Sequence, residues 1–381
     1  AYERILELDP MHDLAFQQLE QLHRLAARWE PLIDVYIGRY DATEDAEEAI
    51  DLLHRIAKVN EEHLDDPIQA QQALMTAWEQ DFTSERTADE LERVTRLLGS
   101  TEAWNEPLQL ANETLQSLQQ ADDYESREIK TALCLRCAKW YGHELNHPEY
   151  SGPYYQQILA MDPTNYAAMQ AQADLHRHLG QWQQLAQMLG RMSEIVQGAH
   201  ERASVFNQMG ELCEDQLQMP DQAPSYYRQA IEADPTHLGA LDNLERLHRR
   251  SESWDPLLEI RRMKVHALEQ QGEPAEVNEA RLQVAELLEL RFERGDEAIE
   301  EYRKILENEP TELRALKGLE RLYAQREGWQ SLYDVLERQL ELVTTEKERV
   351  SILIRLASML EEEFIKPEQA AERLERVLGI D

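Results

Sequence analysis

Residues 143–147 read HELNH, which is the spacing of a zinc-protease motif. Two histidines four residues apart lie on one face of a helix, so His143 and His147 could hold Zn²⁺ while Glu144 acts as a general base. This chemistry needs the motif inside a helix, together with a third ligand and a cleft. A zinc metallohydrolase is therefore one hypothesis, and the elements around the motif must decide it.

The chain contains an internal repeat. Four stretches share one pattern: ILELDPMHDLA (5–15), ILAMDPTNYAA (158–168), AIEADPTHLGA (230–240) and ILENEPTELRA (305–315). Five anchor residues follow at intervals of 72, 81, 72 and 75 residues, and they are Pro10, Phe82, Pro163, Pro235 and Pro310. A tryptophan follows each anchor: Trp29, Trp104, Trp182, Trp254 and Trp329. Self-similarity of this kind is the sequence signature of stacked repeats.

The second half of each unit has its own spacing. A small residue is followed four positions later by a bulky one and eight positions after that by the anchor, as in Ala298, Tyr302 and Pro310. This order resembles the tetratricopeptide repeat, whose signature is W-x2-L-G-x2-Y, A-x3-F and P over about 34 residues. The resemblance implies an all-α superhelical solenoid of antiparallel helix pairs, with about ten repeats in five two-repeat units of 72–81 residues.

The resemblance also predicts how the chain is divided. We expect one continuous solenoid over residues 1–381, in which 1–10 end a preceding repeat and the units are 11–82, 83–163, 164–235, 236–310 and 311–381. Each anchor proline should begin the next helix, where its missing N–H costs nothing. Glu20, Glu245 and Glu320 stand where the family prefers a small residue. The polar segments 118–129 and 269–280 carry extra residues and predict longer loops.

The alignment of the repeats places HELNH at the end of a helix. Residues 143–148 align with 62–67, so Pro148 falls where Pro67 does, directly behind the motif. We therefore expect no metal at His143 and His147, and no cofactor. Cys134, Cys137 and Cys213 align with apolar core positions, which predicts buried thiols rather than a zinc or redox site. One tryptophan per unit likewise predicts core packing.

The composition restricts the class of partner. The chain has 75 acidic against 39 basic residues, a formal net charge of −36. Nucleic-acid binding needs a basic face, so we expect no nucleic-acid partner. No stretch approaches the roughly 20 consecutive apolar residues of a membrane span, so we expect no direct membrane insertion. Sparse glycine, proline and aromatic residues among abundant helix formers favour an all-helical chain.

Charged residues recur at repeat positions. In the family the first helix of each pair lines a concave groove, and this placement puts Arg24, Arg177 and Arg249 at one shared place. Arg96 and Arg321 are expected about one turn earlier, and the acidic members of the pattern are Glu61, Glu214, Glu289 and Glu361. Two alternatives remain open. Neighbouring arginines and glutamates could pair and hold the stack together, or the arginines could bind carboxylates or phosphates of a partner segment.

These observations favour a non-catalytic scaffold that binds protein partners, as one component of a larger bacterial assembly. A structural strut without a groove ligand is the alternative, and a zinc metallohydrolase is the remote one. Neither end shows a polar capping helix, so we expect a piece of a longer array or ends that dock on a larger complex. The sequence leaves the compartment open, with the cytoplasm favoured over the periplasm.

Overall fold

The computed structural model describes residues 1–271 and 274–379. In these two ranges the chain forms 21 α-helices and no strand, which confirms the all-α prediction. The helices form two compact units, residues 1–188 and 189–381, and the division falls within α11. Each unit is a solenoid of stacked helix pairs.

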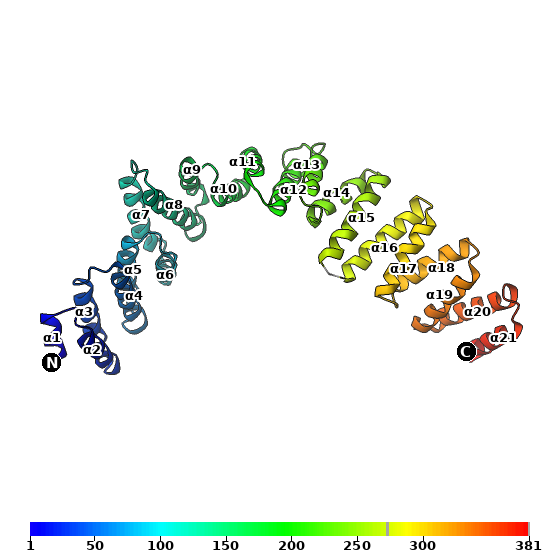
Figure 1. The fold of residues 1–381 in the computed structure, drawn as a ribbon, viewed down its shortest axis with the longest axis horizontal. Helices are drawn as coiled ribbons and strands as arrows, with labels where there is room; N and C mark the ends of the chain where they lie inside the picture. Colours follow the sequence, from blue (N-terminus) through cyan, green and yellow to red (C-terminus); the bar gives the residue numbers. More distant parts are fainter. Residues whose placement is uncertain (272–273, 380–381) are drawn as a thin grey trace. The chain divides into compact units, whose positions relative to one another are not determined.

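The helices of the first unit follow one another with short connections. They are α1 (Tyr2–Leu8), α2 (Asp13–Leu25), α3 (Trp29–Tyr40), α4 (Ala46–His63), α5 (Pro67–Gln80), α6 (Glu85–Leu97), α7 (Asn105–Ser117), α8 (Tyr124–Lys139), α9 (Gly152–Met161) and α10 (Tyr166–His178). Three short helical turns accompany them: η1 (Thr101–Trp104), η2 (Trp140–Glu144) and η3 (Pro148–Tyr150). Figure 1 shows α2, α4 and α6 in one layer of this unit and α3, α5 and α7 in the other.

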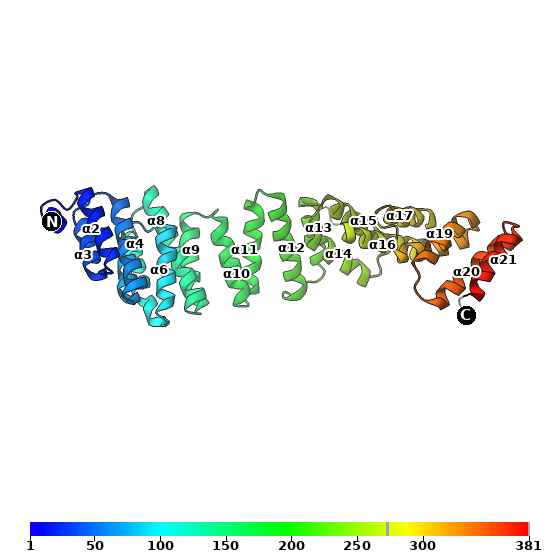
Figure 2. The ribbon, with the colours of Figure 1, turned by 90° about the horizontal axis from the view of Figure 1, so that it is seen from below.

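The second unit continues the pattern from α11 (Trp182–Ile195). Its helices are α12 (Ala199–Asp215), α13 (Ala223–Ala233), α14 (Leu238–Arg250), α15 (Trp254–Gln271), α16 (Pro274–Arg291), α17 (Gly295–Asn308), α18 (Leu313–Gln325), α19 (Trp329–Leu342), α20 (Glu346–Glu362) and α21 (Pro367–Leu378). From α12 onward consecutive helices pack on each other, and α12 also contacts α14 while α16 contacts α18. In Figure 2 the helices of the first unit stand side by side.

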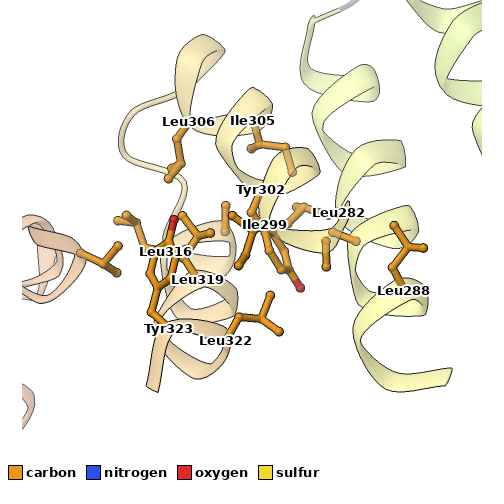
Figure 3. Packing of buried hydrophobic residues seen from close by; sticks show 14 of the residues in the cluster. Leu282, Leu288, Ile299, Tyr302, Ile305, Leu306, Leu316, Leu319, Leu322 and Tyr323 are labelled. Carbon is orange, nitrogen blue, oxygen red and sulfur yellow. The ribbon is translucent and has the colours of Figure 1, made fainter. Parts of the chain in front are cut away.

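Tyrosine rings fill the crossings between pairs. Tyr302 is 1% exposed on α17 and lies between α16 and α18, with Leu288 on one side and Leu322 on the other (Figure 3). A Cβ added to Gly318 on α18 would lie 2.4 Å from the Tyr302 ring, and one added to Gly210 on α12 would lie 2.4 Å from the Tyr227 ring. Small residues therefore stand where the rings need room, as the repeat pattern predicts.

The anchor prolines lie in turns and do not begin helices, which corrects the prediction. Pro10 lies in the turn before α2, whose N-cap is His12, and Pro163 lies before α10, whose N-cap is Asn165. The preceding aspartate shapes the turn, because Asp162 accepts a hydrogen bond from the Thr164 N–H at 3.0 Å. Such an Asx turn pre-forms the bend, and proline adds a fixed φ to it.

Each helix pair turns through one residue of positive φ. Ten of the described residues have this backbone, and they are Ala27, Asp65, Gly99, Asn146, Gly180, Gln218, Glu252, Glu293, Glu327 and Ile365. Asp65 and Gly99, Asn146 and Gly180, Gln218 and Glu252, and Glu293 and Glu327 are each separated by 34 residues. That interval is the length of one tetratricopeptide repeat. The left-handed residue closes the first helix of each pair and reverses the chain.

The longer loop predicted at 269–280 is mostly helix, whereas the one predicted at 118–129 is a loop as far as residue 123. The helix α15 has 18 residues against 12 in α3, and α16 begins at Pro274, so only residues 272–273 of the segment 269–280 lie outside the described residues. In the segment 118–129 the helix α8 begins at Tyr124. Glutamate, alanine and glutamine are good helix formers, and in the segment 269–280 they extend the helices where the repeat pattern predicted a loop.

Candidate functional site

Counting from α2, every fourth helix carries charged residues at corresponding positions. These helices are α2, α6, α10, α14 and α18, and each has 13 residues. The eighth residues are Glu20, Glu92, Ala173, Glu245 and Glu320. The ninth residues are Gln21, Arg93, Asp174, Arg246 and Arg321, and the twelfth are Arg24, Arg96, Arg177, Arg249 and Ala324. We call these positions 8, 9 and 12.

In α6, α14 and α18 the arginine at position 9 makes an ion pair with the helix two places before it. Arg246 on α14 binds Glu214 on α12 through two hydrogen bonds of 2.6 and 2.7 Å. Arg321 on α18 binds Glu289 on α16 in the same way, and Arg93 on α6 binds Glu61 on α4. A planar guanidinium bound by both oxygens of a carboxylate fixes the orientation of both side chains. We call these three interactions the staples.

Buried hydroxyl groups support two of the staples. The Tyr227 hydroxyl donates to Glu214 at 3.2 Å, and the Tyr302 hydroxyl donates to Glu289 at 3.0 Å. The hydrogen bonds from Arg246 lead the interactions that hold the pKa of Glu214 below its ordinary value, and Arg93 does the same for the pKa of Glu61. The predicted groove residues Glu61, Glu214 and Glu289 thus bind arginines of a neighbouring repeat.

Position 8 holds a buried carboxylate in α6 and in α14. Glu92 is 2% exposed and accepts hydrogen bonds from Arg136 at 2.7 Å, Lys139 at 2.6 Å and the Trp140 indole N–H at 2.9 Å. Burial opposes ionisation, but these donors outweigh it and the pKa of Glu92 lies below its ordinary value.

Glu245 is 3% exposed, and Arg249 and Arg261 bind it at 2.6 and 3.0 Å. This is why the chain tolerates glutamate where the family prefers a small residue.

Position 12 remains half exposed. The side chains of Arg24, Arg96, Arg177 and Arg249 are 53, 48, 43 and 58% exposed. Arg24 and Arg249 bind the position-8 glutamate of their own helix, and Arg177 binds Asp174 at 2.5 Å. Arg96 shares this position, whereas the sequence alignment had placed it one turn earlier beside Arg321. The error came from aligning α6 three residues out of register.

Glu361, the remaining predicted glutamate, is exposed near the end of α20. It makes no ion pair with another residue of the described chain. Sequence reasoning missed Arg93, Arg246 and Glu92. Counting from the N-cap residue of each helix, rather than from the anchor prolines and tryptophans, would have found all three.

The HELNH stretch lies at a helix end, as the alignment predicts. His143 and Glu144 belong to the π-turn η2, whereas His147 is the N-cap of η3 and Asn146 has a positive φ of 56°. Arg96 binds both oxygens of Glu144 at 2.7 and 3.0 Å, so this carboxylate is already engaged. Within residues 1–271 and 274–379, no three histidine, cysteine, aspartate or glutamate side chains come together in a way that could hold a metal ion.

One junction of the first unit departs from the staple pattern. Asp174 stands at position 9 of α10, and Gly142 on η2 holds the sequence position that Glu61 holds in α4. A pocket of about 440 Å³ lies here, and its lining includes Gly142, His143, Ser151, Tyr155, Asp174 and His178. At the equivalent junction between α4 and α6, the Arg93–Glu61 staple lines the pocket.

The cysteines are buried, as predicted. Cys134 and Cys137 are 0% exposed and Cys213 is 5% exposed. Burial raises the pKa of Cys134 to about 12, which keeps the thiol protonated. The prediction that every tryptophan packs in the core holds for Trp104 at 4% exposed, whereas Trp29, Trp182, Trp254 and Trp329 are half-buried at helix starts. None of the described helices has the length and apolar character needed to cross a bilayer.

The antiparallel pairs, the 34-residue turn interval and the tyrosine crossings define an α-helical repeat protein. The family model of the tetratricopeptide repeat matches residues 315–350, which include most of α18 and all of α19. Residues 315–350 of this chain are therefore a tetratricopeptide repeat. No curated protein matches its sequence.

Three solved structures are similar to this chain at low sequence identity. PilF of Pseudomonas aeruginosa is 16% identical, with 71% of this chain and 97% of that chain covered and a TM-score of 0.33. Yeast Tom70 is 13% identical, with 98 and 94% covered and a TM-score of 0.31. The structure described as Naa15/Naa10 bound to HypK is 12% identical, with 98 and 64% covered and a TM-score of 0.40.

Proposed function

We propose that this protein is a non-catalytic scaffold that binds other proteins through its first helices. The observation that carries the proposal is the exposure of position 12. Arg24, Arg177 and Arg249 are each half exposed at the same place on their helices. A half-exposed guanidinium is suited to bidentate binding of a partner carboxylate. In a tandem array of this kind, the protein would serve as one component of a larger bacterial assembly.

The staples favour a second function for position 9. Arg93, Arg246 and Arg321 are bound by both oxygens of a glutamate on another helix. Their role is to hold successive pairs in register, as a structural strut requires. The two positions would then have separate roles. Position 9 would hold the stacked helix pairs together, and position 12 would bind the partner.

The decisive experiment compares partners of the wild-type protein and of a variant with Arg24, Arg177 and Arg249 changed to Glu. The tagged full chain is purified from its own cells, and the co-purifying proteins are quantified by mass spectrometry. We expect at least one stoichiometric partner to be lost from the variant, while circular dichroism shows the same helical content as wild type. The melting temperature should fall, because Arg24 and Arg249 also neutralise Glu20 and Glu245.

A matched control reverses three exposed arginines on other helices, namely Arg4 on α1, Arg262 on α15 and Arg303 on α17. This control carries the same change in net charge and should keep the partner. Equal loss from both variants would indicate a general charge effect. Retention of every partner by the folded test variant would reject binding at position 12 and leave the strut.

A further inference from the structure

The pocket at Asp174 lies where the other junctions hold an arginine. Position 9 supplies a guanidinium at Arg93, Arg246 and Arg321, and each meets a glutamate of an earlier helix. At the junction of η2 with α10 both members of the pair are replaced, by Asp174 and Gly142. A Cβ on Gly142 would lie 3.3 Å from Ser151 Oγ, and that hydroxyl donates to the Ala138 carbonyl at 2.7 Å. The π-turn thus leaves little room for a glutamate here.

The pocket keeps the other parts of a guanidinium site. Tyr155 occupies the same repeat position as Tyr227 and Tyr302, whose hydroxyls bind the staple glutamates. Here Tyr155 lines the pocket, and burial together with the nearby Asp174 carboxylate raises its pKa. His143 and His178 add flat imidazole rings to the wall. Carboxylate, hydroxyl and planar rings are the groups on which a guanidinium binds and stacks.

The charge of the pocket favours a cation. Asp174 is 60% exposed, and Arg177 Nη1 binds its Oδ1 atom at 2.5 Å, so a carboxylate that faces solvent lies in the lining of the pocket. The whole chain carries a formal net charge of −36, which attracts basic segments over longer distances. A second arginine on Asp174 would give the carboxylate one guanidinium for each oxygen.

We propose that this pocket binds an arginine side chain from a basic segment of a protein partner, which replaces the arginine that the chain supplies at its other junctions. The inference rests on the proposed scaffold function and assigns a second, chemically distinct contact to it. Position 12 would bind partner carboxylates, whereas the Asp174 pocket would bind a partner guanidinium.

The test uses a capped pentapeptide with one arginine between alanines, and the same peptide with citrulline in its place. Citrulline has the shape of arginine without its charge. We expect saturation-transfer NMR with the full chain to show binding of the arginine peptide with a Kd of about 1 mM, and no binding of the citrulline peptide. Equal binding of both peptides would overturn the proposal.

Variants assign the binding to the pocket. Asp174→Asn should weaken binding of the arginine peptide about tenfold, because it removes the charged acceptor. Asp174→Arg should abolish binding, because the chain then places its own guanidinium there. Both substitutions change a side chain that is exposed in the wild type, so the variants should still fold. Asp51→Asn, which removes an exposed carboxylate paired with Arg55 on α4, is the matched control and should bind like wild type.

Unchanged binding by Asp174→Asn would place the peptide elsewhere and reject the pocket. The outcome is separable from the scaffold test. If the position-12 variant loses its partner but no arginine peptide binds, the scaffold stands and the pocket proposal fails. If the peptide binds at Asp174 while the position-12 variant keeps every partner, the pocket stands and binding at position 12 fails.

Discussion

Arg321 on α18 grips Glu289 on α16 through hydrogen bonds of 2.8 and 3.0 Å, one to each carboxylate oxygen. The glutamate side chain is only 7% exposed, whereas the arginine side chain is 52% exposed. The pair therefore links one repeat to the next, with its carboxylate largely shielded from water. The same relationship joins Arg246 to Glu214 and Arg93 to Glu61.

The staple should be measurable by a double-mutant cycle. We expect Arg321→Gln and Glu289→Gln, separately and together, to give a coupling energy of about 1 kcal/mol in urea denaturation. The exposed pair Arg303–Glu300, at 3.4 Å on one helix, is the control and should give about 0.2 kcal/mol. Equal coupling in both pairs would show that the staple contributes nothing beyond a surface ion pair.

Glu92 should be the most sensitive charged residue of the first unit. Glu92→Gln keeps the shape of the side chain but removes the charge that satisfies Arg136 and Lys139. We expect the free energy of unfolding to fall by about 3 to 5 kcal/mol. Hydrogen exchange of α6 and α8 should accelerate with it. A loss below 1 kcal/mol would mean that water solvates the cluster.

Glu92 also predicts a pH dependence. Its pKa is lowered from the ordinary value of 4.5, so the folded state binds fewer protons than the unfolded chain near that pH. Its contribution to stability is therefore complete above the unfolded pKa and is lost as the pH falls through the lower folded pKa. Urea midpoints measured between neutral pH and pH 3 should decline less steeply for Glu92→Gln than for wild type. A parallel decline would contradict the assignment.

The crossing at Gly210 should reject a methyl group. An added Cβ would lie 2.4 Å from Tyr227 Cε1, and the Tyr227 ring is fully buried. We expect Gly210→Ala to lower the free energy of unfolding by about 1 to 3 kcal/mol. Gly190→Ala is the control, since nothing lies within 4 Å of its Cβ position, and it should be neutral or stabilise by up to about 1 kcal/mol.

A substitution at Ile365 should raise the stability of the protein. It has a φ of 54° and is 81% exposed, so a β-branched residue holds a left-handed backbone without compensating burial. Ile365→Gly should raise the free energy of unfolding by about 1 kcal/mol. Gly180→Ala, at a φ of 67°, should have the opposite sign. If both changes destabilise, the turn energetics are governed by contacts rather than by backbone strain.

Much of the fold was predictable because the repeat amplifies weak signals. Five copies of a small residue followed by a bulky residue at four positions indicate helix crossings, and the Gly210–Tyr227 contact confirms the reason. Capping was less predictable. An Asp-Pro pair reads as a helix start, but the Asp162 side chain closes an Asx turn and delays the helix to Tyr166.

The candidate site was predictable in its residue types and less so in its pairing. The arginines and glutamates are visible in the sequence, and the staples match the alternative in which neighbours pair. An error of three residues hid the role of Arg93, because a shift of one helical turn leaves a charged residue on the same face. The pocket at Asp174 could not be foreseen, since it depends on the π-turn that brings Gly142 against Ser151.

The missing staple at Gly142 and Asp174 has a consequence for cooperativity. In a linear stack, the free energy of unfolding is a sum of intrinsic terms and nearest-neighbour interface terms. A junction that lacks its guanidinium–carboxylate pair has a weaker interface, so the helices before and after it are coupled less tightly than their neighbours. Occupation of the pocket by a partner arginine would restore that coupling. Binding of the partner would then make the helices on the two sides of the junction unfold more cooperatively.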